Sequence, residues 1–181
     1  MKNLLMVVDP QIDFISGSLP VPGAEEAMQA LARHLLGSAG AYAAKVVTLD
    51  FHPRGHCSFD INGGRWPVHC QAHTQGAAIW PELAEALYES PGEVFLYCKG
   101  QDADREEYSV FQNAEAKASI ENLVRDTRPE RIDICGLAGD ICVLNTLRDG
   151  RAIFGAEKFS VLGKFSPSLD GGEALRKLLE A

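Results

Sequence analysis

Long apolar runs and an excess of positive charge are both missing from this chain of 181 residues. Its first apolar run, Leu4–Val8, ends at the charged residue Asp9, so the N-terminus does not resemble a signal peptide. No stretch approaches the ~18 apolar residues that a membrane-spanning helix needs. Lys and Arg number 17 against 25 for Asp and Glu, which gives a formal net charge of −8. Nucleic acid and membrane are therefore not expected as partners.

Cysteine is too sparse for a disulfide scaffold. The chain has five cysteines, an odd number, and this is typical of reduced thiols in a cytoplasmic protein when no secretion signal is present. Hydrophobic residues at 46% and charged residues at 23% exclude a disordered or collagen-like chain. A chain of this length forms one domain by default, and we expect that domain to span residues 1–181. The five cysteines are Cys57, Cys70, Cys98, Cys135 and Cys142.

Short apolar runs alternate with helix-like segments. The runs predict strands at Leu4–Val8, Lys45–Leu49, Val94–Cys98, Arg131–Cys135 and Glu157–Leu162. Helices are predicted at Ala24–Leu36, Pro81–Tyr88, Glu115–Asp126, Asp140–Arg148 and Glu173–Leu179. Strands that are apolar throughout indicate a parallel sheet covered on both faces. The expected fold is α/β, a single doubly wound (Rossmann-like) parallel sheet of about five to six strands with helices on both faces.

Polar residues follow the predicted strands at their carboxyl ends. Asp9, Asp50 and Lys99 follow the first three strands, and the turn from Gly136 to Cys142 follows the fourth. Parallel sheets bind ligands beyond these ends. We therefore expect two carboxylates, an amine and a thiol to converge on one rim of the sheet, as a catalytic site requires.

The first candidate site comprises Asp9, Lys99 and Cys142. A cysteine nucleophile reacts as its thiolate, so its site must lower the thiol pKa or supply a base. Cys142 would lie in the first turn of the helix that begins near Asp140, which would be its N-cap or lie just inside it. Lys99 would stabilise the thiolate and Asp9 would accept the proton. The alternative is a buried core thiol beside a structural ion pair, but three converging strand ends favour catalysis.

The second candidate site is a metal site. Asp50 and His52 lie two apart in an extended segment and so point the same way, and His69 would complete the set from the far side of a long loop, residues 50–80. Two imidazoles and a carboxylate suit one divalent ion, with Zn²⁺ favoured over Fe²⁺ or Mn²⁺. His56 would be a fourth ligand or a residue behind the ligands. Structural or surface roles are expected for Cys57, Cys70, His34 and His73.

Three aromatic residues, Phe14, Trp66 and Tyr108, lie in segments that adjoin these candidate sites. A flat apolar ligand would fit between such rings. The alternative is that they are ordinary core or loop anchors.

Five segments of the chain match a known family in order: Val8–Phe14, Asp50–Phe59, Trp66–Cys70, Tyr97–Gly100 and Gly136–Val143. On these segments the chain resembles the nicotinamidase/pyrazinamidase branch of the isochorismatase-like cysteine hydrolases. The segments run through most of the chain, and their combination is highly specific.

The resemblance implies hydrolysis of nicotinamide to nicotinate and ammonia. Cys142 would attack the carboxamide carbon to form a thioester, Asp9 would pass the thiol proton to the leaving ammonia, and Lys99 would support the charge. The backbone amides of Ala138 and Cys142 would form the oxyanion hole, and a cis peptide would join Leu137 to Ala138.

The resemblance also assigns the pocket. The metal on Asp50, His52 and His69 would bind the pyridine nitrogen or its water, and Phe14 and Trp66 would stack on the ring. Two departures would alter this pocket. Gly139 stands where nicotinamidases usually have Thr or Leu, and Ile141 where Tyr, His or Phe is common.

Two other functions stay open: another cysteine amidohydrolase of the same superfamily acting on a different small amide, and a catalytically inactive binding protein. The metal residues argue against the first, and the intact Asp9, Lys99 and Cys142 argue against the second. Isochorismatase itself is disfavoured, because its chemistry does not use the cysteine nucleophile. Small α/β enzymes of this type often self-associate, so a homo-oligomer is compatible with the sequence.

Overall fold

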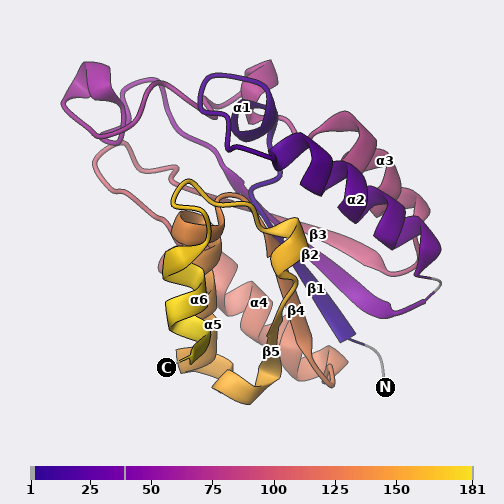
Figure 1. Ribbon diagram of the computed structural model, residues 1–181. Helices are drawn as coiled ribbons and strands as arrows, with labels where there is room; N and C mark the ends of the chain where they lie inside the picture. Colours follow the sequence, from indigo (N-terminus) through magenta and orange to yellow (C-terminus); the bar gives the residue numbers. More distant parts are fainter. Residues whose placement is uncertain (1–2, 39, 181) are drawn as a thin grey trace.

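Five parallel strands form one sheet in the computed structural model, which describes residues 3–38 and 40–180 (Figure 1). The strands are β1 (Asn3–Val8), β2 (Tyr42–Asp50), β3 (Glu93–Lys99), β4 (Ile132–Gly136) and β5 (Phe159–Val161). Their order is β3-β2-β1-β4-β5, and every pairing is parallel. The chain therefore runs outward from β1 to β3 and then crosses to β4 and β5, which confirms the predicted doubly wound sheet.

Helices cover both faces of the sheet (Figure 1). Three contribute to the core on one face: α1 (Ile12–Ile15), α2 (Ala24–Gly37) and α3 (Pro81–Glu89). Three contribute to the core on the other face: α4 (Ala114–Thr127), α5 (Leu144–Phe154) and α6 (Glu173–Glu180). The central strand β1 supplies both cores, Leu5 and Val7 to the first and Leu4, Met6 and Val8 to the second, all fully buried. Burial on both sides explains its continuous apolar sequence.

Element boundaries differ from the prediction where neighbouring strands or turns decide them. Strand β2 is longer than predicted because it pairs with β1 on one side and β3 on the other. Strand β5 is shorter because it pairs only with the first three residues of β4, and Ala156–Lys158 forms a 3₁₀ turn before it. Helix α1 was not predicted, since four residues are too few to show helical periodicity. The other 3₁₀ turns are Asp60–Asn62, Gln75–Ala77, Val110–Gln112 and Gly163–Phe165.

The carboxyl ends of the strands lie at one edge of the sheet, where the long loops gather at the top of Figure 1. Asp9 directly follows β1, Asp50 and Lys99 are the last residues of β2 and β3, and Gly136 is the last residue of β4.

All five cysteines are free thiols, as expected. Within residues 3–38 and 40–180, no helix is long and apolar enough to cross a membrane.

Candidate active site

Lys99 is the centre of the site. Its Nζ lies 2.9 Å from Asp9 Oδ2, 2.5 Å from Asp50 Oδ1 and 3.6 Å from Cys142 Sγ. All four side chains are buried. The structure therefore brings the predicted Asp9, Lys99 and Cys142 together, and it also shows a contact that the sequence did not predict. Asp50 belongs to both candidate sites, because one of its oxygens pairs with Lys99 while the other faces the histidines.

Electrostatics keep this lysine charged. Burial acts to lower the pKa of Lys99, but the carboxylates of Asp50 and Asp9 outweigh it and hold that pKa well above its usual value. Two carboxylates buried side by side would repel each other in the absence of a cation. Lys99 is therefore an ammonium ion that permits both to lie within reach of the thiol.

Asp9 is fixed by its neighbours. Its backbone has a φ of +47°, and the Thr48 hydroxyl donates a 2.6 Å hydrogen bond to Asp9 Oδ1. Burial raises the pKa of Asp9 above its usual value, although Lys99 acts in the opposite direction. A carboxylate with a raised pKa is a stronger proton acceptor. Sequence reasoning missed Thr48, whose only signal was its place near the end of β2, where it pairs with Val8.

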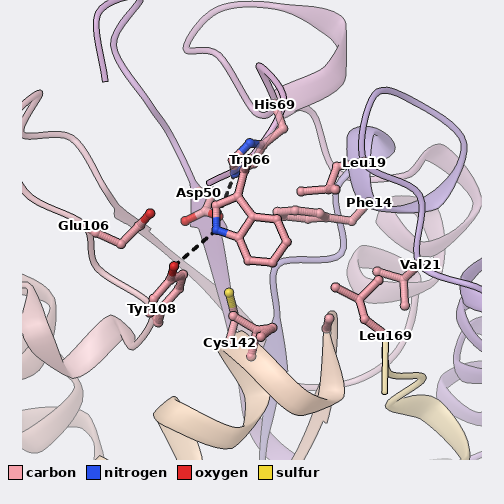
Figure 2. A pocket seen from close by; sticks show the side chains of 12 residues that line it. Phe14, Leu19, Val21, Asp50, Trp66, His69, Glu106, Tyr108, Cys142 and Leu169 are labelled. Atoms are coloured by element: carbon pink, nitrogen blue, oxygen red, sulfur yellow. Dashed lines mark hydrogen bonds and ion pairs between the residues drawn. The ribbon is translucent and has the colours of Figure 1, made fainter. Parts of the chain in front are cut away.

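Cys142 lies in a π-helical turn, Gly139–Val143, that immediately precedes α5. Asp140–Arg148 is therefore helical as predicted, but its first turn is π-helical and the α-helix begins only at Leu144. Figure 2 shows the Cys142 sulfur pointing into a pocket. Burial raises the pKa of this thiol well above its usual value. The resting group is consequently a neutral thiol, and it needs a base to become a nucleophile.

Of the two positions expected for Asp140, the structure shows the second, because Asp140 lies just inside the turn as its second residue. Ala138 occupies the N-cap position of the turn, and its side chain makes no cap hydrogen bond. The Asp140 carboxylate instead accepts hydrogen bonds from the backbone amides of Leu169 and Asp170. The peptide bond between Leu137 and Ala138 is cis, as the resemblance implied.

Asp50, His52 and His69 form a cluster in which one ligand atom of each lies within 4.8 Å of the others. His52 Nδ1 lies 2.9 Å from the carbonyl of Gly100, and His69 Nδ1 lies 2.7 Å from that of Pro67. Carbonyls only accept hydrogen bonds, so both Nδ1 atoms carry the proton and both Nε2 atoms are free to bind a metal. These Nε2 atoms lie 3.5 and 3.9 Å from Asp50 Oδ2.

One buried atom of this cluster has no partner. His52 Nε2 is buried and makes no hydrogen bond to any residue within the described ranges. A buried polar atom without a partner is costly, and a metal ion would satisfy it. Two neutral imidazoles and a carboxylate therefore fit a divalent ion.

His56 lies behind the ligands. Its Nδ1 lies 2.7 Å from Ser58 Oγ and its Nε2 lies 3.1 Å from the carbonyl of Arg105. The ring stacks on His52 with 4.0 Å between centroids. Both nitrogens are thus engaged by the protein, which favours the outer position among the two alternatives.

Outside the cluster, His73 is exposed, His34 is half-buried near Tyr42, Cys57 is half-buried and Cys70 is fully buried.

Further side chains hold the three candidate ligands in position, and sequence reasoning missed them. The buried Gln11 amide donates to the carbonyl of Asp50 at 2.7 Å and accepts from its N–H at 2.8 Å. Glu107 accepts from the N–H of Gly100, whose carbonyl binds His52. Asp13 accepts from the N–H of Cys70, the residue after His69. Metal ligands commonly depend on such outer contacts for their orientation.

The pocket above Cys142 encloses about 380 Å³, part of it open to solvent. Phe14, Trp66 and Tyr108, the three aromatic residues singled out in the sequence, all line it, and Trp66 Nε1 donates to the Tyr108 hydroxyl at 3.2 Å. Glu106 was not predicted to take part, yet it also lines the pocket (Figure 2). Burial raises the pKa of the Glu106 carboxyl above its usual value. The remaining lining residues are Leu19, Val21, Asp50, His69, Ala138, Ile141, Cys142 and Leu169.

Comparison with known proteins gives consistent matches. The family model for the isochorismatase domain matches residues 3–153. The nicotinamidase of Saccharomyces cerevisiae is 30% identical over an alignment that covers 99% of this chain and 94% of that protein. The nicotinamidase/pyrazinamidase of Mycobacterium tuberculosis is 33% identical, with 80% and 76% covered. The crystal structure of the Pyrococcus horikoshii pyrazinamidase in complex with zinc superposes with a TM-score of 0.80 at 28% identity, with 99% and 94% covered.

Proposed function

Because this chain belongs to the isochorismatase family, in its nicotinamidase branch, we propose that it hydrolyses nicotinamide to nicotinate and ammonia through a thioester on Cys142. The observation that carries the proposal is the arrangement around Lys99. One ammonium contacts the proposed base, the proposed nucleophile and a proposed metal ligand directly below an aromatic-lined pocket.

The first half of the reaction forms the thioester. Asp9 takes the thiol proton of Cys142, and the sulfur attacks the carboxamide carbon. Negative charge then develops on the amide oxygen, where the N–H groups of Ala138 and Cys142 donate hydrogen bonds. Asp9 gives its proton to the amide nitrogen, the C–N bond breaks, and ammonia leaves. A carboxyl with a raised pKa suits both steps, because it accepts and returns a proton within one cycle.

The second half regenerates the enzyme. Asp9 takes a proton from a water molecule, the resulting hydroxide attacks the thioester carbon, and the C–S bond breaks to release the carboxylic acid. The sulfur recovers its proton from Asp9. Lys99 keeps its charge throughout and stabilises the anionic carboxylate of Asp9 and the sulfur of Cys142 in turn.

Asp50, His52 and His69 would bind the divalent ion, with Zn²⁺ the favoured candidate. When bound, the ion would supply a Lewis acid at the part of the pocket that Asp50 and His69 line. Phe14 and Trp66 would contact the faces of the substrate ring, and Tyr108, fixed by its bond to Trp66, would close the polar side. These contacts orient the carboxamide toward Cys142.

An ammonia-release assay tests the function. We expect purified protein to hydrolyse nicotinamide and pyrazinamide, to act poorly on benzamide because it lacks the ring nitrogen, and to lose activity after chelation. Benzamide is the matched control, since its shape is almost the same. Hydrolysis of aliphatic amides without hydrolysis of nicotinamide would instead indicate another amidohydrolase. No turnover of any amide, with metal supplied, would indicate a binding protein.

A further inference from the structure

The pocket has two chemically different walls (Figure 2). Asp50, Glu106 and Tyr108 lie on one side. The opposite side is apolar and includes Phe14, Leu19, Val21 and Leu169. Leu169 lines the pocket while 41% of its surface is exposed, so it lies at the pocket entrance. A ring whose heteroatom faces the polar wall would place its opposite edge against this leucine.

The segment that carries Leu169, residues 166–170, is attached directly to the turn that carries Cys142. The N–H of Gly139 donates to the carbonyl of Pro167 at 2.8 Å. The Asp140 carboxylate accepts from Leu169 N at 2.9 Å and from Asp170 N at 3.1 Å. Three hydrogen bonds from two consecutive residues thus fix the segment beside the nucleophile.

Gly139 makes this close approach feasible. A Cβ atom at this position would lie 2.3 Å from Ser168 Oγ and 2.5 Å from the carbonyl oxygen of Ser166. Any larger side chain would push segment 166–170 away from the turn. The absence of a side chain therefore determines how far Leu169 reaches over the pocket.

The other end of the segment is fixed as well. The Asp170 carboxylate accepts from Gly172 N at 2.7 Å and from Ala174 N at 2.8 Å, at the start of α6. The carboxylates of Asp140 and Asp170, which both accept hydrogen bonds from backbone amides, therefore hold Leu169 in place. A leucine in such a fixed position acts as a wall with a defined shape.

We propose that Leu169 sets the upper size limit of the substrate ring, and that Gly139 and Asp140 are positioning residues that hold it in place. The inference rests on the proposed function and narrows its substrate class to planar aromatic carboxamides without a substituent on the edge that faces Leu169. For nicotinamide with its ring nitrogen toward Asp50 and His69, that edge includes ring position 5.

Competition between nicotinamide and 5-methylnicotinamide tests the wall. In Leu169→Ala, we expect the kcat/KM ratio of the methylated to the plain substrate to rise about tenfold or more, since one methylene in a fitted pocket changes discrimination by roughly 10–200-fold. Asp140→Ala should raise the ratio in the same direction, and Asp140→Asn less, because its amide oxygen still accepts one hydrogen bond. Leu179→Ala is the control: this leucine is 45% exposed on α6, outside the pocket, and the ratio should not change.

A second measurement does not depend on the reaction. Alkylation of Cys142 by iodoacetamide and by the bulkier N-phenyl iodoacetamide, read by peptide mass spectrometry, reports access to the pocket. Leu169→Ala should accelerate the bulky reagent selectively. If that occurs while the parent protein fails to hydrolyse nicotinamide, the wall is supported and the proposed function is wrong. The opposite outcome is that the parent protein hydrolyses nicotinamide while Leu169→Ala changes neither the kcat/KM ratio of the two substrates nor the ratio of the two alkylation rates. In that case the inference about the wall is wrong and the proposed function stands.

Discussion

At the scale of single residues, the site depends on one buried cation shared among three anionic or potentially anionic groups. Lys99 contacts Asp9, Asp50 and Cys142, so removal of any partner changes the charge that the others experience. Burial raises the pKa values of both Cys142 and Asp9. The pair is therefore suited to exchange a proton in the proposed catalytic cycle, with neither group acting as a permanent thiolate or a permanent acid.

Cys142→Ala should abolish turnover while leaving the fold and the metal content unchanged, because the sulfur is the only proposed attacking atom. Cys57→Ala, which removes a half-buried thiol outside the pocket, is the matched control and should keep parental activity. Ammonia release and elemental analysis of the same samples provide the measurement. Activity of Cys142→Ala within about tenfold of the parent would contradict covalent catalysis.

Asp9→Asn should lower kcat by about 10²–10⁴-fold and change KM far less, since the amide keeps the shape but accepts no proton. In the parent, kcat/KM should fall as pH drops through the pKa of Asp9, because the protonated carboxyl is no longer a base. That pKa is raised, so the fall should begin above the ~4 typical of an exposed aspartate. The pH profiles of kcat and KM for the parent and for Asp9→Asn test this prediction. If kcat falls and KM rises by the same factor in Asp9→Asn, Asp9 has only a structural role.

At the scale of elements, the ends of the strands and the turns beyond them place the functional groups. The last residue of β3 is Lys99, and the chain then turns at Gly100 with a φ of +66°. This turn directs the carbonyl of Gly100 to His52 while its N–H binds Glu107. One glycine therefore links the end of β3 to the proposed metal ligand His52 on the loop after β2.

Gly100→Ala should weaken metal binding by about 10–100-fold, the usual effect of disturbing the contacts behind a ligand. A Cβ atom here would lie 2.4 Å from His52 Cε1 and displace the ring. Gly63→Ala is the matched control, because Gly63 also has a positive φ, +85°, but a Cβ there meets nothing within 4 Å. Titration of both variants with Zn²⁺ separates the clash with the His52 ring from the backbone strain of a positive φ. Similar Zn²⁺ affinities of the two variants would show that only the backbone strain matters.

At the scale of the whole molecule, the metal residues connect segments that are far apart in the sequence. Asp50 ends β2, His52 follows it, and His69 lies beyond a loop that also supplies Trp66 to the pocket. An ion bound by all three would cross-link this loop to the sheet. Because such an ion binds the folded chain and finds no preformed site in the unfolded one, it should stabilise the protein as a whole.

Zn²⁺ should therefore raise the melting temperature of the parent, and chelation should reverse the change. A free Zn²⁺ concentration one hundred times Kd adds about 2.7 kcal/mol to the free energy of unfolding. His52→Ala should not respond to Zn²⁺, whereas His73→Ala, which removes an exposed histidine of the same loop, should respond as the parent does. His56→Ala should also retain the ion. Loss of the Zn²⁺ response in His56→Ala would make His56 a true ligand.

The sequence by itself determined the five strands and five of the six helices, and it named the main candidate site residues. Apolar runs and helical periodicity depend on residues close together in the chain, so they predicted the five strands and the parallel sheet, and the order of the strand-end residues placed Asp9, Asp50 and Lys99 at one rim. Short segments also contain the ligand types that a metal prefers, which is why Asp50, His52 and His69 could be named together.

Only the tertiary structure decided how these groups act on one another. The ion pair between Asp50 and Lys99, the hydroxyl of Thr48 on Asp9 and the hydrogen bonds of Asp140 to segment 166–170 join residues 29 to 49 positions apart. Such contacts depend on which strands become neighbours and how loops pack over them, and no local periodicity encodes that. Burial likewise sets the pKa of Cys142, because the cost of a buried charge depends on everything packed around it.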